Sequence, residues 1–567
     1  MTTITSGTGD RARGRASLRP GPVPPGTLTA VSQADPSPHA QKDAPGTYPG
    51  APRPEQVTAT PLADLARRLG TPAPADADVP VTGITHDSRA VRPGDLYAAL
   101  PGARFHGADF AAQAARLGAA AVLTDAAGHD RAAATGLPVL VVDDPRARMG
   151  ALAAGIYGEP GEGLLRIGIT GTSGKTTTAY LMEGGLRAAA GATGGLTGLI
   201  GTVETRIGDE RLKSERTTPE ATDLQALFAV MRERGVTSLA MEVSSHALVL
   251  GRVDGCVFDV AVFNNLSPEH MEFHSGMEDY FQAKAQLFTK ARSRAGVVNL
   301  DDEYGRRLAA GESEVPVTTF SAEGHPDADW RAVDVQVGAL GSTFTVLGPQ
   351  GRSVRAAAPI PGPFNVANAL AAITALVVAG IDPQTAADGV AAVPGVPGRL
   401  ERVDAGQPYL AVVDYAHKTD AVESVLRALR KVTEGRLHAV LGCGGDRDAQ
   451  KRAPMGAAVA RLADTAVLTS DNPRSEDPLA ILATMLAGAA EVPAHERGTV
   501  LVLEDRAAAI AAAVARAEPG DTVLVAGKGH EQGQDIAGVV RPFDDRQVLR
   551  EAVEASVAPQ KQPNHQG

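Results

Sequence analysis

The stretch Ile167–Thr178 reads Ile-Gly-Ile-Thr-Gly-Thr-Ser-Gly-Lys-Thr-Thr-Thr, and it constrains the fold of this chain more than any other segment. Residues 166–170 alternate like a short strand, residues 171–174 form a glycine-rich turn, and a helical pattern follows. Such a strand, turn and helix N-terminus bind anions, because backbone N–H groups and the helix dipole point at phosphate. Lys175 adds a positive charge, and the Thr176 hydroxyl stands where a Mg²⁺ ligand is needed. The stretch predicts a nucleotide-binding α/β domain.

The match to the general phosphate-loop pattern is incomplete. The full pattern has glycine where this chain has Ile169, five residues before Gly174. A plain glycine turn that links a strand to a helix is the alternative interpretation. Gly-Lys-Thr at the start of a helix, directly after an apolar strand, disfavours that alternative. The departure favours a narrower family than the general motor and switch ATPases.

Composition excludes several classes of protein. The 567 residues include 54 Lys+Arg and 66 Asp+Glu, so the net charge is −12, which argues against a nucleic-acid-binding protein. Two cysteines cannot build a disulfide framework, and they indicate a reducing compartment. No apolar run reaches the roughly 18 residues of a membrane helix, and the N-terminus lacks a signal-peptide core. We expect a soluble, cytoplasmic monomer that binds neither nucleic acid nor membrane.

The chain divides into three predicted domains. Residues 1–56 are rich in Pro, Gly, Ser and Thr, and we expect a disordered N-terminal extension. A small α/β domain follows at 57–160, and a central domain with the phosphate loop and a parallel sheet spans 161–392. Strands alternate with helices again over 393–556, which predicts a Rossmann-like, doubly wound domain. Residues 557–567 read as a disordered tail.

Polar residues follow several strands of the predicted central domain. Glu242 ends one apolar strand, and His270 follows another. Ligands of parallel α/β sheets bind at such strand ends, so both residues are reasonable cation ligands beside Thr176. Taken singly, each would more often be an ordinary surface or core residue. Lys284 lies on a predicted helix over 280–290, where a lone lysine is normally a solvated charge.

The last predicted domain repeats the same organisation. Strands at 409–413, 437–441, 465–469 and 522–526 each end in a polar loop, so the four loops share one edge of the sheet. A Gly-x-Gly-Gly run begins at Gly442, but no acidic partner follows at the dinucleotide spacing. A nicotinamide oxidoreductase is therefore a weak alternative.

These motifs together resemble the Mur ligase family over residues 60–555. The motifs that carry the resemblance are Asp87–Arg89, Thr170–Thr177, Thr217–Pro219, Met241–His246, Asn265–His270, Ala283–Lys284, Phe364–Asn368, Gly398–Arg399, Asp414–His417, Gly445–Asp448 and Asp471–Arg474. The Asp87–Arg89 motif alone reads as a turn and nothing more. Their number and order make the resemblance specific.

The resemblance implies an ATP-dependent amide-forming reaction in peptidoglycan precursor synthesis, and hence a role in cell-wall biogenesis, cell shape and division. The terminal D-Glu carboxylate of a UDP-linked muramoyl dipeptide would attack the γ-phosphate of ATP. An amino acid would then attack the acyl phosphate. Metal charge would offset the repulsion between carboxylate and triphosphate.

The family's positions can be carried over to this chain residue by residue. The implied ATP site is Gly171, Thr172, Ser173, Gly174, Lys175, Thr176, Thr177, Asn365, Arg399 and Asp414. The implied Mg²⁺ ligands are Thr176, Glu242, His270 and Lys284. Lys284 matches a carbamylated lysine, and a carbamate would turn its cation into an anion. The resemblance makes Lys175, Lys284 and His270 the catalytic residues.

Two further sets of residues are implied to bind the other substrates. The muramoyl dipeptide would contact Ser88, Thr217, Thr218, Ser244, Arg252 and Lys284. Diaminopimelate would contact Arg447, Asp471, Asn472, Pro473, Arg474, Gly527 and Glu531. Arg474 can pair bidentately with the far carboxylate of diaminopimelate, which lysine lacks, and Glu531 could hold the far ammonium. Leu250 and Lys418 depart from the family pattern, which has Gln in some relatives and usually Thr at these positions.

Several alternatives stay open at this point. A lysine-adding Mur ligase or a folylpolyglutamate-type ligase would use the same framework. A P-loop switch or binding protein would bind or hydrolyse nucleotide without any small-molecule acceptor. The sequence does not separate meso- from LL-diaminopimelate, because both carry the far carboxylate.

Overall fold

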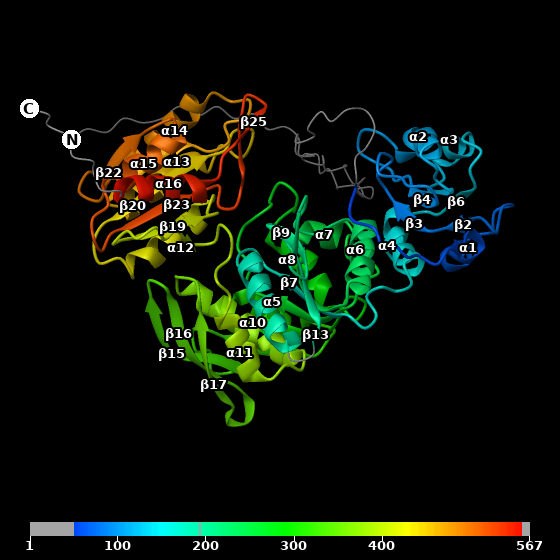
Figure 1. Cartoon of the computed structure of the whole chain (residues 1–567), viewed down its shortest axis with the longest axis horizontal. Coiled ribbons are helices and arrows are strands. Elements are labelled where there is room, and N and C mark those ends of the chain that lie inside the picture. Colours follow the sequence, from blue (N-terminus) through cyan, green and yellow to red (C-terminus); the bar gives the residue numbers. More distant parts are fainter. Residues whose placement is uncertain (1–49, 192–193, 558–567) are drawn as a thin grey trace, which may run out of the picture. The chain divides into compact units, whose positions relative to one another are not determined.

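The computed structural model describes residues 50–191 and 194–557. Three α/β domains follow one another along the chain, each around its own main sheet (Figure 1). This confirms the predicted fold class. The predicted disorder of residues 1–49 and 558–567 lies outside the described residues.

The N-terminal domain has a four-stranded parallel sheet in the order β3-β4-β5-β6. Its elements are β1 (Thr60–Pro61), α1 (Leu62–Leu69), β2 (Pro80–Val81), β3 (Gly83–Thr85), β4 (Asp95–Ala98), α2 (Ala111–Arg116), β5 (Ala121–Thr124), α3 (His129–Ala133), β6 (Val139–Val141) and α4 (Pro145–Ile156). The helix predicted over 62–69 has those bounds, and it ends at Gly70, whose φ of +69° suits glycine.

Residues 50–56 correct the predicted N-terminal boundary. Arg53 donates a hydrogen bond to the Tyr157 hydroxyl at 2.5 Å and lies 3.6 Å from the Asp95 carboxylate. Only 8% of the Arg53 side chain is exposed. The polar, Pro-rich composition of this segment gave no sign of the contact. Both partners of Arg53 are distant in sequence, so local patterns could not predict it.

The central domain is built on an eleven-stranded mixed sheet in the order β10-β9-β8-β11-β7-β12-β13-β14-β15-β16-β17. Its strands are β7 (Leu165–Thr170), β8 (Leu196–Ile200), β9 (Glu204–Ile207), β10 (Glu210–Lys213), β11 (Val236–Glu242), β12 (Phe258–Phe263), β13 (Ser293–Asn299), β14 (Val317–Ser321), β15 (Trp330–Gly338), β16 (Gly341–Leu347) and β17 (Ser353–Ala358). The strands from β8 to β15 in this order are parallel, and antiparallel hairpins extend both edges. Short hairpin connections permit these edges, whereas parallel strands need crossovers.

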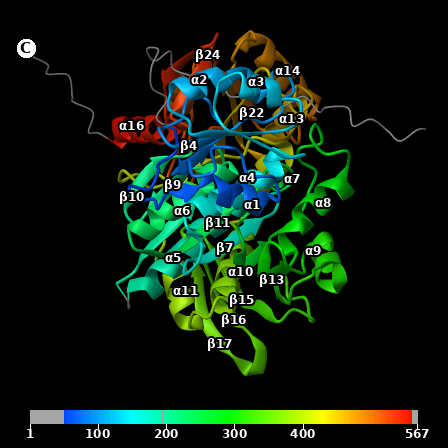
Figure 2. The ribbon, with the colours of Figure 1, turned by 90° about the vertical axis from the view of Figure 1, so that its right-hand side faces the viewer.

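Helices cover both faces of the central sheet. They are α5 (Lys175–Gly191), α6 (Ala221–Glu233), α7 (Ser245–Val249), α8 (Met277–Ala285), α9 (Glu303–Arg307), α10 (Phe364–Val378) and α11 (Pro383–Ala391). Ile167 and Ile169 pack on one face with α5, α10 and α11, which lie side by side in Figures 1 and 2. Met241 and Phe263 pack on the other face with α6 and α8. The helix predicted over 280–290 ends earlier, because α8 passes into a short 3₁₀ turn that stops at Phe288.

The C-terminal domain has a six-stranded sheet in the order β18-β19-β23-β20-β21-β22, parallel from β19 to β22. Its elements are β18 (Glu401–Arg402), β19 (Leu410–Asp414), α12 (Thr419–Arg430), β20 (Leu437–Cys443), α13 (Arg452–Leu462), β21 (Thr465–Ser470), α14 (Pro478–Glu491), β22 (Thr499–Val502), α15 (Arg506–Val514), β23 (Thr522–Ala526), β24 (Gly533–Ile536), β25 (Val539–Pro542) and α16 (Asp545–Val557). Helices α12 to α14 pack on one face, and α15 and α16 on the other, as in a doubly wound sheet.

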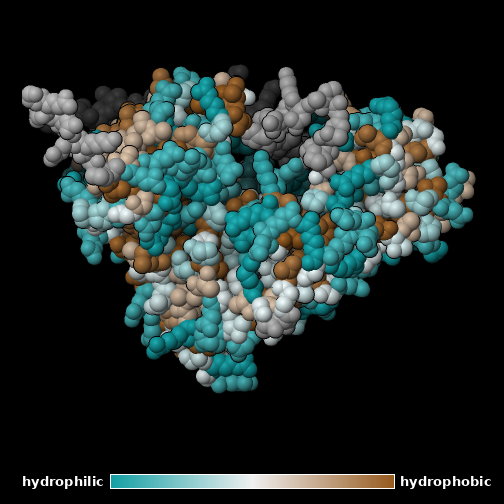
Figure 3. Space-filling view, in the orientation of Figure 1, coloured by the Kyte–Doolittle hydropathy of each residue, from teal (hydrophilic) through white to brown (hydrophobic). Residues whose placement is uncertain are grey.

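The surface carries no large uniform apolar region on the face shown in Figure 3, where hydrophilic and hydrophobic residues are interspersed. Within residues 50–191 and 194–557, no helix is both long and apolar enough to cross a membrane.

Candidate active site

The phosphate loop lies between the central strand β7 and helix α5, at the carboxyl edge of the sheet. Gly174 has a φ of +85°, and a Cβ there would lie 2.3 Å from the side chains of Asn264 and Asn368. Glycine is therefore required by both conformation and space. The Ser173 N–H donates to Asn265 Oδ1 at 2.8 Å, which fixes the loop against the end of β12. This backbone suits a phosphate group.

Lys175 is folded along this loop. Its Nζ donates to the carbonyl oxygens of Gly171 at 2.7 Å and Thr172 at 2.9 Å. Burial lowers the pKa of Lys175, although the carboxylates of Glu269 and Glu242 oppose that shift. The loop thus presents a lysine whose charge has few partners, which suits an anionic ligand.

Thr176 and Glu242 form an oxygen-rich group next to the loop. The Thr176 hydroxyl donates to Glu242 Oε2 at 3.0 Å, and the Thr202 N–H donates to Oε1 at 2.7 Å. Hydroxyl and carboxylate oxygens are ligands that Mg²⁺ accepts, so these two side chains fit the metal. The described residues contain no group of three or more His, Cys, Asp or Glu poised for a metal ion, so the metal role of His270 stays a prediction.

His270 occupies an unusual backbone position between two carboxylates. Its φ is +57°, and its ring nitrogens lie 3.5 Å from Glu269 and 3.4 Å from Glu272. Its ring meets that of His246 edge to face at 4.6 Å. A residue held at positive φ beside a phosphate loop is a mark of a functional segment.

Lys284 lies on α8, and its Nζ donates to the Gly171 carbonyl at 3.0 Å. Its side chain is 1% exposed and covers the Tyr280 ring at 4.5 Å. Burial, together with the nearby charge of Lys175, holds the pKa of Lys284 well below its ordinary value. A lone helical lysine is normally solvated, but here the helix turns Lys284 toward the phosphate loop, where the family resemblance implies a role; that role stays a prediction.

The predicted ATP contacts outside the loop have structural partners. Asn365 Nδ2 donates to the Pro361 carbonyl at 2.6 Å, and its Oδ1 accepts from Asn368 Nδ2 at 2.9 Å. Asp414 accepts from the backbone N–H groups of Leu400 at 2.8 Å and Ala416 at 2.7 Å. The positions fit a scaffold around the nucleotide, and direct contacts stay a prediction.

Arg399 connects the last domain to this edge. Its Nη2 donates to the Thr176 hydroxyl at 3.2 Å, and its guanidinium stacks on the Tyr415 ring at 4.8 Å. Lys418, which departs from the family pattern, contacts the carboxylate of Glu269.

The residues predicted to grip the muramoyl dipeptide gather around the end of β11. The Thr218 hydroxyl donates to the Glu242 carbonyl at 2.8 Å and accepts from the Ser244 N–H at 3.2 Å. Thr217 and Thr202 hydroxyls lie 3.0 Å apart. In the N-terminal domain, the buried Ser88 donates to Gln113 at 3.2 Å.

Three arginines lie near the Glu220 carboxylate, beside this group. Its carboxylate lies 2.9 Å from Arg252 Nε, 3.3 Å from Arg146 and 3.8 Å from Arg216. Asp223 lies near Arg216 and Glu220, so two carboxylates share the positive charge of the three arginines. A group of arginines of this kind suits an acidic substrate.

The residues predicted to bind diaminopimelate meet at the carboxyl edge of the C-terminal sheet. Gly445 N–H donates to the Asn472 carbonyl at 2.8 Å, which joins the loops after β20 and β21. Gly527 has a φ of +116°, and a Cβ there would lie 2.6 Å from Asp471 Oδ2. Glycine at this point lets the loop after β23 approach the other two.

Arg474 is held in this pocket at a φ of +54°. Its Nη1 donates to the Gly445 carbonyl at 2.6 Å, and its N–H donates to the Asp535 carbonyl at 3.0 Å. Arg447 is exposed, and like Arg474 it flanks Gly444. The carboxylate of Glu531, on the loop after β23, accepts from Asn472 Nδ2 at 2.9 Å, so this edge of the sheet carries both a cation and a carboxylate.

Sequence reasoning missed two charged residues of these sites. Glu269 contacts Lys418, and although burial alone would raise its pKa, the cations Lys175 and Lys418 lower it to about 2. Lys528 is completely buried between the loops of the C-terminal pocket. Both stand next to residues that the motifs singled out, His270 and Gly527, and that proximity was the available signal.

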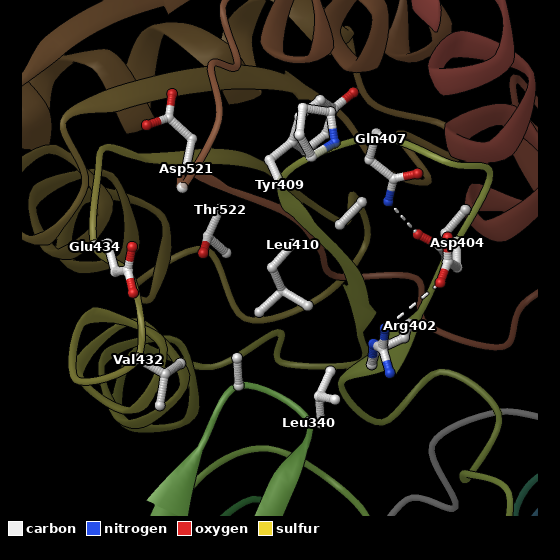
Figure 4. A pocket seen from close by; sticks show the side chains of 15 residues that line it. Leu340, Arg402, Asp404, Gln407, Tyr409, Leu410, Val432, Glu434, Asp521 and Thr522 are labelled. Atoms are coloured by element: carbon white, nitrogen blue, oxygen red, sulfur yellow. Dashed lines mark hydrogen bonds and ion pairs between the residues drawn. The ribbon is translucent and has the colours of Figure 1, made fainter.

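A separate hollow of about 280 Å³ lies at the opposite edge of the C-terminal sheet (Figure 4). Its lining includes Asp404, Tyr409, Asp521 and Thr522, near the amino ends of β19 and β23. The polar loops follow the carboxyl ends of these strands, so the hollow is not part of the candidate site.

The fold and site define an enzyme with a phosphate loop in its central domain and a group of charged, polar loops at the carboxyl edge of its last sheet. The catalytic domain of the Mur ligase family matches residues 80–157, the Mur ligase middle domain matches 169–376, and the Mur ligase glutamate ligase domain matches 398–529.

Relatives named UDP-N-acetylmuramoyl-L-alanyl-D-glutamate–2,6-diaminopimelate ligase support the same assignment. The Streptomyces coelicolor protein is 82% identical over 89% of this chain and 99% of its own length. The Streptomyces avermitilis protein is 80% identical over 90% and 99%. A solved structure of a ligase with this name has a TM-score of 0.65 and 32% identity, and covers 88% of this chain and 99% of that one. The chain belongs to the Mur ligase family.

Proposed function

We propose that the chain is an ATP-dependent ligase that adds diaminopimelate to UDP-N-acetylmuramoyl-L-alanyl-D-glutamate in peptidoglycan precursor synthesis. The observation that carries this proposal is that a cation, Arg474, and a carboxylate, Glu531, are both held by the loops at the carboxyl edge of the last sheet in a complete ligase framework. The far end of diaminopimelate carries both a carboxylate and an ammonium, and the two side chains complement these charges. The names of the close relatives support the same substrate.

The reaction needs an activated acid and then an amine. The D-Glu carboxylate attacks the γ-phosphate of ATP, which releases ADP and forms an acyl phosphate. The amino group of diaminopimelate then attacks the acyl carbon, releases phosphate and forms the amide. In this chain, Lys175 and the loop N–H groups bind the phosphates, while Thr217, Thr218, Ser244 and Arg252 hold the dipeptide.

Mg²⁺ would be held by Thr176 and Glu242, with His270 and a carbamylated Lys284 as further ligands. When bound, the metal supplies positive charge between the triphosphate and the carboxylate. A depressed pKa supports carbamylation, because the neutral amine of Lys284 is the form that reacts with CO₂. The resulting carbamate would also remove an unpaired cation from a buried position.

Lysine is disfavoured as the added amino acid by the same pocket. Its side chain has no far carboxylate, so Arg474 would stay unpaired while a second ammonium entered beside it. A site that loses the partner of a charged group discriminates strongly. We place the reaction in the cytoplasm of the cell, in keeping with the two buried free thiols Cys256 and Cys443, and we propose a monomer.

The test is ATP turnover with the UDP-linked dipeptide and one added amino acid at a time. We expect turnover with diaminopimelate and little with lysine, and separated meso and LL isomers in the same assay identify the preferred one. Preferred use of lysine would refute the specificity. Turnover with a folate acceptor would favour a folylpolyglutamate-type ligase, and full-rate ATP hydrolysis without any acceptor would favour a P-loop switch protein.

A further inference from the structure

Lys528 is a buried cation to which the reaction above assigns no part. It follows β23 directly after Gly527, and none of its side chain is exposed. Its Nζ donates to Asn472 Oδ1 at 2.9 Å and to Glu531 Oε2 at 3.1 Å. Both partners belong to the amino-acid pocket. Burying an ammonium is costly, so a lysine at this position needs a reason.

The first consequence of Lys528 is the orientation of the Asn472 amide. Lys528 Nζ and the Asp535 N–H, which lies 3.0 Å from Asn472 Oδ1, can only donate hydrogen bonds. The amide oxygen of Asn472 must face these two donors. Its NH₂ group therefore points to Glu531, whose Oε2 accepts at 2.9 Å. Without the Lys528 ammonium, the Asn472 amide oxygen would have one hydrogen-bond donor fewer to orient it.

The second consequence concerns the charge that Glu531 offers. Its Oε2 accepts from both Lys528 and Asn472, whereas no hydrogen bond of the described residues involves its Oε1. About a third of the Glu531 side chain is exposed, 35%. Glu531 is thus held by one oxygen and keeps the other available for an ammonium group.

Glu531 and Arg474 are held by separate partners, Glu531 by Lys528 and Asn472 and Arg474 by backbone groups. Arg474 is held by the Gly445 carbonyl and the Asp535 carbonyl, and the Ala537 N–H donates to its own carbonyl at 2.7 Å. Among the described residues, no carboxylate forms a salt bridge with Arg474. The pocket therefore keeps one cation and one carboxylate unpaired with each other, and a ligand that carries both charges can complement both without first breaking an ion pair.

We propose that Lys528 is a positioning residue for amino-acid selection, which orients Asn472 and keeps Glu531 ready for the far ammonium of a diamino acid. This inference rests on the proposed function, since it assumes that the pocket takes diaminopimelate. Lys528 does not touch the reacting atoms, so it governs binding of the amino acid more than the chemical step.

The test compares steady-state kinetics of wild type, Lys528→Met, Glu531→Gln and the double variant. We expect Lys528→Met to raise KM for diaminopimelate about tenfold, because hydrogen bonds to a charged group are lost, while KM for ATP and for the dipeptide stay within about twofold. The double variant should be little worse than Glu531→Gln alone, since both changes remove the same ammonium contact. Lys431→Met, at an exposed lysine that follows α12, is the matched control and should change nothing.

An amino acid without the far ammonium separates positioning from a general loss of structure. With 2-aminopimelate, which keeps the far carboxylate, Lys528→Met should change KM by less than about twofold, because Glu531 has no ammonium to bind. An equal rise in KM for both amino acids, or additive effects in the double variant, would overturn the inference. If Lys528→Met does not fold, Lys528→Gln replaces it, because glutamine keeps a neutral donor to Asn472. This variant should raise KM for diaminopimelate by a smaller factor and leave KM for 2-aminopimelate nearly unchanged. An unchanged KM for diaminopimelate in Lys528→Gln also overturns the inference.

The wild-type control distinguishes failure of the proposed function from failure of the role proposed for Lys528. Wild type that fails to use diaminopimelate refutes the proposed function. Wild type that uses diaminopimelate, with a Lys528→Met variant of unchanged KM, refutes only the role of Lys528.

Discussion

The central and C-terminal domains each bury cations near a substrate pocket, but they partner them in opposite ways. Lys284 in the central domain has only the Gly171 carbonyl and the Tyr280 ring, and no carboxylate of the described chain forms a salt bridge with it. Arg506 in the C-terminal domain pairs with Asp545 through two hydrogen bonds of 2.7 Å, with both side chains fully buried.

We propose that the difference separates a functional cation, Lys284, from a structural one, Arg506. Arg506 also donates to the carbonyls of Ser470 and Ala526, so it joins the ends of β21 and β23 beneath the amino-acid pocket. Removing one partner of a buried ion pair is costly to the fold, whereas a buried cation without a counter-charge is a candidate for chemistry. Removing charged groups from each domain should therefore affect different properties.

The largest effect is expected from Asp545→Ala. Loss of the carboxylate leaves the Arg506 guanidinium buried and unpaired, which costs about 3–5 kcal/mol of stability. Hydrogen exchange followed by mass spectrometry should show faster exchange in the C-terminal domain than in the central one. Asp64→Ala, which breaks the exposed pair with Arg67, should cost less than about 1 kcal/mol. Unchanged hydrogen exchange in Asp545→Ala would show that the buried Arg506–Asp545 pair does not stabilise the C-terminal domain.

Lys284→Met should give the reverse pattern. We expect activity to fall at least about a hundredfold, because a charged group at the phosphate loop is lost. Stability should hold or rise, since an apolar side chain of similar size replaces an unpaired amine. The measurements are ATP turnover and thermal unfolding, with Lys290→Met at an exposed lysine as the control.

The proposed carbamate adds a second readout at the same position. Short carboxylates should partly restore the activity of Lys284→Ala, because they would replace the anion of the proposed carbamate. An unmodified amine at Lys284 in a high-resolution map of active enzyme would count against the carbamate.

Arg474→Lys tests the cation that we propose binds the far carboxylate of diaminopimelate. Lysine keeps the charge but cannot form the planar, bidentate pair with a carboxylate, so KM for diaminopimelate should rise about tenfold. KM for ATP should stay unchanged. A variant with wild-type KM would show that charge alone, without fork geometry, is sufficient there.

The smallest effect is a pH dependence at Glu220, whose carboxylate lies near Arg216 and Arg252 of the central domain and Arg146 of the N-terminal domain. Burial alone would raise the pKa of Glu220, but Arg252, with His86, Arg146 and Arg216, outweighs it and lowers the pKa. A lowered folded pKa contributes stability above the unfolded pKa of about 4.3, and this contribution is lost as pH falls through the folded pKa. Wild type should therefore exceed Glu220→Gln in stability at neutral pH, and the gap should shrink in acid unfolding experiments below about pH 4.3. A gap that stays constant with pH would contradict this.

Much of the fold could be predicted from periodicity. The alternation of residues 166–170 and the glycine turn after it identified β7 and the start of α5, and the strands of the last domain followed from short apolar runs between polar loops. The anchor at Arg53 could not be predicted, because its partners Tyr157 and Asp95 are remote in sequence. The antiparallel edges of the central sheet likewise depend on pairing between strands that have no local signature.

In the candidate site, too, some residues could be predicted from local motifs and others could not. Local motifs placed Lys175, Glu242 and Arg474 at strand ends, and parallel strands bring such ends to one edge. Only the family resemblance singles out Lys284, and no motif singles out Lys528, because burial and partners are properties of packing and not of spacing.

The sequence by itself determined the class of fold, the phosphate loop and the positions of the polar loops, because these depend on contacts within a few residues. Only the tertiary structure decided which charges are paired and which are not. Whether a buried lysine meets a carboxylate, as Lys528 does, or only a carbonyl and a ring, as Lys284 does, depends on helices and loops far apart in the chain. Low-dielectric surroundings make that difference large in free energy.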